Sequence, residues 1–134
     1  MQKIFILAAI GFSAFLGFII YTANTGNEMP AQQLVRSIDH GDKVAHFLLF
    51  GALSFLLNLA VTTKSFRWRR LSIYRGTALV AVFAVFEEGS QRFISSRSFD
   101  YFDLLADLMG VALFAFVTAL FIRTSYCLNC RNHM

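Results

Sequence analysis

Residues 86–110 read FEEGSQRFISSRSFDYFDLLADLMG, which places acids, an amide and arginines between two strongly apolar segments. The stretch holds five of the eight acidic residues of the chain, namely Glu87, Glu88, Asp100, Asp103 and Asp107. Ionisable groups beside long apolar runs are costly in lipid and usually mark a functional site or an internal pairing. We therefore expect this stretch to form the outward-facing polar site of a small membrane protein.

The composition supports that class of protein. The chain has 134 residues, of which 57% are hydrophobic and sixteen are Phe, and this is too apolar for an ordinary soluble core. Residues 4–27, 44–63 and 108–122 lack acidic and basic residues apart from one histidine, and a shorter apolar run covers 76–86. We predict an all-α fold, a single membrane domain of residues 1–134, with four transmembrane helices near residues 4–22, 43–62, 72–90 and 104–122.

The first apolar run could be read as a signal peptide, because Lys3 gives it a weakly basic start. Its apolar core is longer than a typical signal sequence, however, and residues 21–23 do not form a small-x-small cleavage site. Ala9, Ser13 and Gly17 give it a face of small residues that lets helices approach closely in lipid. We expect this segment to be retained as a helix.

Basic residues predict the orientation. Eight of the twelve fall on one side of the predicted bundle: Lys3, Lys64, Arg67, Arg69, Arg70, Arg75, Arg123 and Arg131. Lysine and arginine favour the cytoplasmic side, so we expect cytoplasmic N- and C-termini, with residues 123–134 as a short tail. The basic segment 64–75 could also contact anionic lipid head groups. Because these loops account for the net charge of +4, we expect no nucleic-acid partner.

Three of the predicted helices bring ionisable groups to a similar depth. The rise of a helix is about 1.5 Å per residue, so Glu87 lies about 18 Å from Arg75 at the cytoplasmic end of its helix. By the same rise, Asp107 lies about 24 Å from Arg123, and His46 lies about 27 Å from Lys64. The hydrocarbon core is about 30 Å thick. All three groups therefore belong to the outer leaflet.

The polar residues of each helix also share a face, because residues four apart are neighbours on a helix. This spacing occurs in the pairs Asp42 and His46, Glu87 and Gln91, and Asp103 and Asp107. Charges at this depth require partners or water. We expect one cluster in which the carboxylates pair with Lys43, His46, Arg92 and Arg97.

Two further segments carry weaker signals. Residues 31–38 have an amphipathic pattern and could form a short interfacial helix, although eight residues are few for this purpose. Cys127 and Cys130, with His133 nearby, match one half of a zinc site, but the chain has no second pair of cysteines. The alternative is a cytoplasmic tail that carries two reduced thiols.

The polar residues resemble a known family. The pattern Asp42-Lys43-x-x-His46-Phe47, then Glu87-x-x-x-Gln91, then Arg97-x-x-Asp100-x-x-Asp103, followed by Gly110, resembles the VanZ-like family of small bacterial membrane proteins. The resemblance covers roughly residues 39–120, and members are associated with teicoplanin resistance. It implies a multi-pass protein of the bacterial plasma (inner) membrane with a role in the cell envelope. It supplies no reaction.

Position 107 departs from this pattern, because the family usually has Asn there and this chain has Asp107. A buried carboxylate must be paired, hydrated or protonated. A protonated Asp would imitate much of the hydrogen bonding of Asn, whereas an ionised Asp would add a charge to the site.

Three functional hypotheses follow. In the first, the site recognises or modifies an envelope molecule, such as a lipid-linked wall precursor, a glycopeptide-related molecule or a phospholipid head group. The candidate catalytic residues are then His46, Glu87, Glu88 and Asp103, with His46 as general acid or base. The candidate ligand-binding residues are Asp42, Lys43, Gln91, Arg97, Asp100 and Asp107. Whether a reaction occurs at all stays open.

In the second hypothesis the cluster only holds the helices together, at ~0.6 kcal/mol per polar contact. The third is a proton-coupled carrier, which four short helices without inverted repeats do not favour unless the protein forms a homo-oligomer. Membrane lipids are the expected partners. No cofactor is expected, although a divalent metal on Glu87, Glu88, Asp103 and His46 is chemically feasible.

Overall fold

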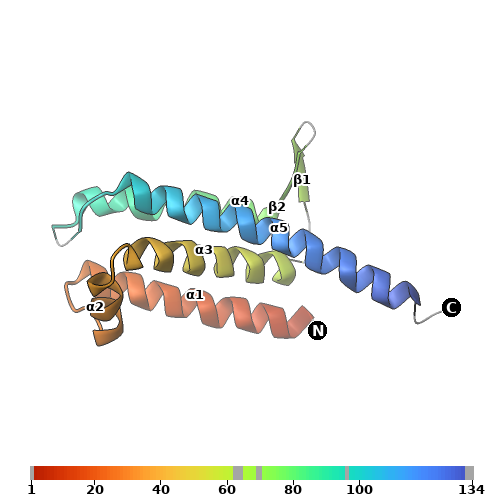
Figure 1. The fold of residues 1–134 in the computed structure, drawn as a ribbon, viewed down its shortest axis with the longest axis horizontal. Helices are drawn as coiled ribbons and strands as arrows, with labels where there is room; N and C mark the ends of the chain where they lie inside the picture. Colours follow the sequence, from red (N-terminus) through yellow and green to blue (C-terminus); the bar gives the residue numbers. More distant parts are fainter. Residues whose placement is uncertain (1, 62–64, 69–70, 96, 132–134) are drawn as a thin grey trace.

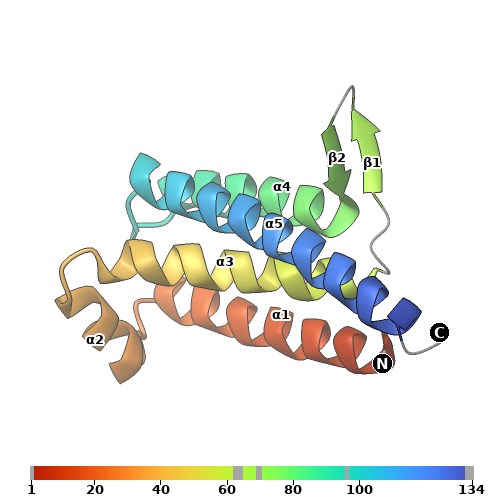
Figure 2. The ribbon, with the colours of Figure 1, turned by 45° about the vertical axis from the view of Figure 1, so that its right-hand side comes forward.

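The computed structural model describes the backbone of residues 2–61, 65–68, 71–95 and 97–131. It describes their side chains as well, except those of residues 65–68, 71–72 and 125–131. Four helices run side by side, as Figures 1 and 2 show. They are α1 (Gln2–Asn24), α3 (Gly41–Ala60), α4 (Arg75–Ser90) and α5 (Tyr101–Arg131). The connecting elements are helix α2 (Pro30–Ser37), strands β1 (Ser65–Trp68) and β2 (Leu71–Tyr74), and the 3-10 turn η1 (Gln91–Phe93).

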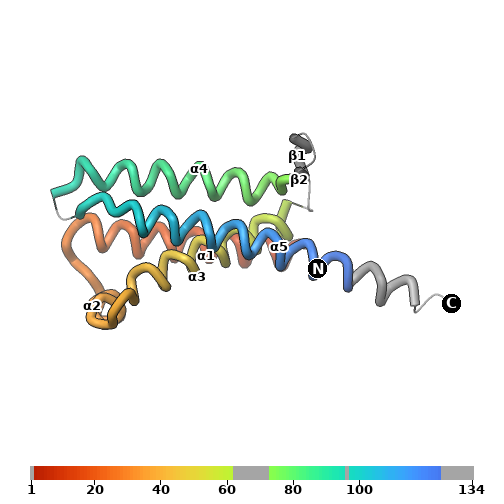
Figure 3. Tube along the Cα trace, turned by 45° about the horizontal axis from the view of Figure 1, so that its top comes forward, coloured from red at the N-terminus to blue at the C-terminus, as the bar shows by residue number. Residues whose placement is uncertain are grey.

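The two ends of the bundle differ. The start of α1, the far end of α5 and the antiparallel β1–β2 hairpin lie at one end (Figure 1). Helix α2 and the connection between α4 and α5 lie at the other end, and Figure 3 shows α2 where the chain passes from α1 to α3. Each of the four helices therefore runs the length of the bundle.

In the part of the chain that the structure describes, three helices are long and apolar enough to cross a membrane: Gln2–Asn24, Gly41–Ala60 and Tyr101–Thr124. The all-α prediction is confirmed. Helix α4 occupies most of the fourth predicted segment, but its 16 residues extend only about 24 Å, less than the hydrocarbon core of about 30 Å.

The predicted starts of the last two helices were wrong. Residues 72–74 belong to strand β2, which pairs with β1, so α4 begins at Arg75. Helix α5 begins at Tyr101 instead of residue 104, because Asp100 Oδ1 accepts a hydrogen bond of 2.8 Å from the Phe102 N–H and caps the helix. It continues to Arg131, well past residue 122. The side chains of Cys127 and Cys130, and all of His133, lie outside the described part of the chain.

Helix α3 lies at the centre and packs against α1, α4 and α5. The buried core draws on all four long helices: Leu16, Phe50, Leu53, Val80, Ala84 and Val111. Large apolar side chains remain exposed on the outer faces, among them Ile4, Leu7 and Phe18 on α1 and Leu105, Met109 and Phe116 on α5. A soluble monomer rarely exposes so much apolar surface, whereas lipid covers it.

Two glycines allow α3 and α5 to approach closely. A Cβ atom on Gly110 of α5 would meet the backbone oxygen of Phe47 and lie 2.9 Å from its carbonyl carbon. A Cβ atom on Gly51 of α3 would lie 2.5 Å from Cδ2 of Phe114. The close contact of α3 and α5 therefore depends on having glycine at these two positions, and small residues are common between helices in lipid.

Helix α2 is attached to the end of α1 by Gln32. Its side-chain oxygen accepts hydrogen bonds from the Met29 N–H at 2.7 Å and the Thr22 hydroxyl at 3.0 Å. Its amide nitrogen donates to the Ile19 carbonyl at 3.0 Å. The prediction of a short helix in this region is confirmed. Its contacts fix the helix over one end of the bundle.

At the opposite end, Asn58 joins α3 to the start of α4. Its Oδ1 accepts a hydrogen bond of 2.9 Å from the Thr77 N–H, and its Nδ2 donates to Thr77 Oγ1 at 2.9 Å. Asn58 is buried. The first N–H groups of a helix have no partner within the helix, so Asn58 satisfies one of them.

Replacing Asn58 by leucine should therefore destabilise the protein by about 1–3 kcal/mol, because a buried N–H loses its partner. Thermal unfolding in a single detergent measures this loss. Asn27→Leu is the matched control, since Asn27 is exposed. Equal melting temperatures for the two variants would show that Asn58 does not support α4.

Candidate functional site

The first part of the site surrounds Lys43, in the first turn of α3. Its Nζ lies 2.9 Å from Asp103 Oδ1, 3.0 Å from Asp100 Oδ2 and 3.5 Å from Asp42 Oδ2. The ammonium group therefore joins α3 to the beginning of α5. The Phe102 N–H and the Lys43 ammonium both donate to Asp100, and they hold the pKa of this carboxyl below its usual value.

The second part lies one turn further along the same two helices. His46 Nδ1 is 3.0 Å from Asp107 Oδ1, and the side chain of Asp107 is fully buried. Its other oxygen, Oδ2, has no hydrogen-bond partner among the residues that the structure describes. The His46 ring stacks on Phe50 with an interplanar angle of 3° and a centroid separation of 6.0 Å, which fixes the plane of the imidazole.

The third part comes from the end of α4. Gln91 Nε2 donates to Glu87 Oε2 at 3.0 Å and to Glu88 Oε2 at 3.1 Å. Arg97 Nε donates to Gln91 Oε1 at 3.3 Å. Glu88 Oε1 accepts from the Asp100 N–H at 2.9 Å, which connects this part to the first. Glu88 and Gln91 are almost completely buried.

The structure brings all ten candidate site residues to one end of the bundle: Asp42, Lys43, His46, Glu87, Glu88, Gln91, Arg97, Asp100, Asp103 and Asp107. Arg97 and Arg92 differ from the prediction that both pair with carboxylates. Arg97 donates to the amide oxygen of Gln91 and pairs with none of the carboxylates that the structure describes. The guanidinium carbon of Arg92 lies 5.6 Å from the centroid of the Phe99 ring, and none of the described carboxylates pairs with it. The reason is its position in η1, where Gln91 faces inward and Arg92 faces solvent.

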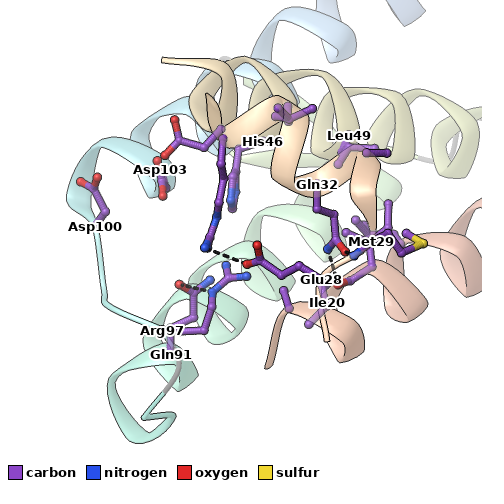
Figure 4. A pocket seen from close by; sticks show the side chains of 18 of the residues that line it. Ile20, Glu28, Met29, Gln32, His46, Leu49, Gln91, Arg97, Asp100 and Asp103 are labelled. Atoms are coloured by element: carbon purple, nitrogen blue, oxygen red, sulfur yellow. Dashed lines mark hydrogen bonds and ion pairs between the residues drawn. The ribbon is translucent and has the colours of Figure 1, made fainter. Parts of the chain in front are cut away.

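A cavity of about 1090 Å³ opens beside these groups (Figure 4). One wall is apolar and comes mainly from α1 and α3, with Phe15, Leu16, Ile19, Ile20, Leu49 and Phe50. The other wall is polar, with His46, Glu87, Gln91, Arg97, Asp100 and Asp103. A long apolar group and a polar group could therefore occupy this cavity together.

The sequence analysis did not assign Glu28, Gln32 and Arg36 to the site, although all three line the cavity. Arg36 Nη1 and Glu28 Oε1 form an ion pair of 2.7 Å across α2. The local signals were the amphipathic pattern of residues 31–38 and the start of α2, where Pro30 at the first turn is followed by Gln32 at the capping position. These signals predict a short helix and say nothing of a cavity.

Among the residues that the structure describes, one group could hold a metal ion. His46, Glu88 and Asp107 each offer a ligand atom, and these atoms lie within 4.8 Å of one another. The group differs from the set suggested by the sequence, because Asp103 pairs with Lys43 and Glu87 with Gln91.

The apolar outer surface, the three long apolar helices and the buried ionisable cluster define a small multi-pass helical membrane protein. The model of the VanZ/LLP1 family matches residues 10–122, and the chain belongs to this family. The resemblance found in the sequence is thus confirmed. Neither the curated proteins nor the solved structures include a match to this chain.

Proposed function

We propose that this protein binds an amphiphile of the bacterial cell envelope, with the head group at the polar wall of the cavity and the chain along the apolar wall. The observation that carries the proposal is the cavity itself, in which Ile20 and Leu49 face one part of the space and Arg97 and Asp103 another (Figure 4). Sites for small molecules combine apolar walls with a few convergent polar groups.

We place the cavity in the outer leaflet of the plasma membrane, with both termini in the cytoplasm. The start of α1, the end of α5 and the β1–β2 hairpin lie together at one end of the bundle (Figure 1). Most of the lysines and arginines in the described part of the chain also belong to elements at that end, and such residues favour the cytoplasmic side: Lys3, Arg67, Arg75, Arg123 and Arg131. On this placement α4 is a fourth crossing helix, completed at one end by β2 and at the other by η1.

Arginines support a phosphate-bearing head group. Arg97 of the polar wall and Arg36 of α2 both line the cavity, and a guanidinium group binds phosphate through two parallel hydrogen bonds. Arg36 pairs with Glu28, whereas Arg97 pairs with none of the described carboxylates, so Arg97 is the arginine that we expect a phosphate to engage. His46 also lines the cavity and could transfer a proton to or from a bound head group. A phospholipid or a lipid-linked wall precursor has both the phosphate and the apolar chain that the two walls require.

Native mass spectrometry of the detergent-purified protein tests this proposal, with dioleoylphosphatidylglycerol and undecaprenyl phosphate as probes. We expect one phosphate-bearing lipid to remain bound per chain, and dioleoylglycerol, which has no phosphate, to bind more weakly. Arg97→Gln should weaken binding about tenfold, since one charge-assisted contact is lost. Arg92→Gln is the matched control, because Arg92 is exposed and lies against Phe99.

Two results would contradict the proposal. One is equal retention of the phosphate-bearing lipids and dioleoylglycerol, and the other is an equal effect of Arg97→Gln and Arg92→Gln.

A structural role is the second candidate, because one observation favours it. Lys43 of α3 contacts Asp103 of α5 and also Asp100, which caps α5. His46 of α3 contacts Asp107 of α5, so the cluster also joins two helices. If no lipid probe is retained and neutralising the cluster lowers the melting temperature, the cluster serves the fold alone.

A further inference from the structure

We propose that His46, Glu88 and Asp107 form a binding site for a transition-metal dication, Zn²⁺ or Mn²⁺. The three residues come from three helices, α3, α4 and α5, and their ligand atoms lie within 4.8 Å of one another. The site does not depend on the amphiphile proposed above, since none of its ligands is a lipid group.

The free oxygen of Asp107 is the first reason. Its side chain is fully buried, Oδ1 lies 3.0 Å from His46 Nδ1, and Oδ2 has no hydrogen-bond partner in the part of the chain that the structure describes. An unsatisfied buried carboxylate oxygen is costly, and more so when the group is ionised. A dication beside it would satisfy this oxygen.

The distances are the second reason. Two neighbouring ligand atoms that are each about 2.1 Å from one ion lie about 3.0 Å apart in octahedral geometry and about 3.4 Å apart in tetrahedral geometry. His46 Nδ1 and Asp107 Oδ1 already have this separation, through a hydrogen bond that a bound ion would replace. Because the three ligand atoms are within 4.8 Å of one another, side-chain shifts of at most about 1.4–1.8 Å would complete the set.

The surrounding contacts are the third reason, because ligands of metal ions are usually oriented by hydrogen bonds from a second layer of groups. Glu88 receives such bonds from Gln91 Nε2 at 3.1 Å and from the Asp100 N–H at 2.9 Å. His46 is held by its stacking on Phe50. The potential ligands are thus largely prepositioned.

The charge balance is consistent with a dication. The cluster contains six carboxylates, those of Asp42, Glu87, Glu88, Asp100, Asp103 and Asp107. Its permanent cations are Lys43 and Arg97, of which Lys43 contacts Asp42, Asp100 and Asp103. No basic side chain other than His46 contacts Glu88 or Asp107 among the described residues, so a dication would neutralise two carboxylates that lack a permanent countercharge.

The chemistry of the ligands indicates which ion. A set of one imidazole and two carboxylates suits Zn²⁺ or Mn²⁺ better than Ca²⁺, which prefers oxygen ligands alone. Three protein ligands leave at least one coordination position for water or another molecule. Because His46 also lines the cavity, a bound ion would lie next to the space where we place the head group.

Electron paramagnetic resonance with Mn²⁺ tests the site, using tag-free protein in detergent that has been stripped with EDTA. Mn²⁺ that binds to the protein no longer contributes to the signal of the free ion. We expect one Mn²⁺ to bind per chain and Zn²⁺ to displace it. Asp107→Asn and His46→Ala should each weaken binding at least about tenfold. Mn²⁺ also avoids the thiols of Cys127 and Cys130, which prefer softer ions.

Two matched controls lie on the turn before α3. Asp39→Asn and His40→Ala remove the same chemical groups from exposed positions, and neither should change Mn²⁺ binding. Circular dichroism and gel filtration establish that each variant is folded, and Asn at position 107 keeps the shape of the side chain. A folded wild-type protein that binds no Mn²⁺ and no Zn²⁺ would overturn the proposal, as would equal binding by Asp107→Asn.

The lipid measurement is repeated with EDTA so that the two proposals can fail separately. Lipid retention in EDTA with no Mn²⁺ site would leave only the amphiphile proposal, and a Mn²⁺ site without lipid retention would leave only the metal proposal.

Discussion

Replacing Gly110 by alanine should lower the melting temperature of the purified protein by several degrees. The added Cβ would meet the backbone oxygen of Phe47, which belongs to the facing helix and cannot rotate away as a side chain could. Helices α3 and α5 would have to separate, and overpacking of this kind costs about 1–3 kcal/mol. The same separation would lengthen the contacts of Lys43 and His46 with α5.

The expected loss of stability is opposite to the usual effect of this substitution, because Gly→Ala inside a helix normally stabilises the helix by about 1 kcal/mol. Gly17→Ala is the matched control, since nothing lies within 4 Å of the Cβ that would be added there. We expect Gly17→Ala to leave the melting temperature unchanged or raise it. A Gly110→Ala protein as stable as Gly17→Ala would mean that α3 and α5 are not in the close contact described above.

Replacing Lys43 by methionine should destabilise the protein by roughly 1–3 kcal/mol. Methionine has a similar length but no charge, so Asp100 and Asp103 lose their shared countercharge. Removing one partner of a fully buried ion pair costs about 3–5 kcal/mol. We expect less here, because 27% of the Lys43 side chain and 37% of the Asp100 side chain remain exposed.

A second substitution should recover part of this loss. Asp103→Asn in the Lys43→Met background removes one of the carboxylates that have lost their partner, so positions 43 and 103 are then both neutral while Asp100 keeps its charge. The denaturation midpoint of the double variant should therefore exceed that of Lys43→Met alone. Lys3→Met serves as control, because Lys3 is exposed at the start of α1. Additive effects of the two substitutions would show that the residues do not interact.

Much of the fold could be predicted from the apolar runs, because lipid-facing helices need long segments without charge. The extents of α1 and α3 were predicted within two residues. Two features were not predicted. The hairpin depends on pairing between residues 65–68 and 71–74, in a basic segment that was interpreted as a topology signal and a possible contact for anionic lipid head groups. The early start of α5 depends on the cap formed by Asp100, a side-chain contact that hydropathy does not report.

The cluster could be predicted because its members repeat at four-residue spacing on three helices, and isolated charges in lipid need partners. The identity of the partners was harder. Whether Arg92 or Arg97 faces inward depends on the turn η1. This turn is a 3-10 helix, with three residues per turn, whereas the prediction assumed the spacing of an α-helix. Likewise, Gln32 reaches Ile19 and Thr22 only because the chain reverses direction between α1 and α2.

The contacts of Lys43 bear on how the protein enters the membrane. Its partners Asp100 and Asp103 follow it by 57 and 60 residues, so they are synthesised only after the whole of α3. Until then the ammonium group of Lys43 has only the neighbouring Asp42 as a partner, and α5 would carry uncompensated carboxylates if it entered the bilayer alone. Each helix thus lowers the cost of inserting the other, and their final integration should be a joint event rather than two independent ones.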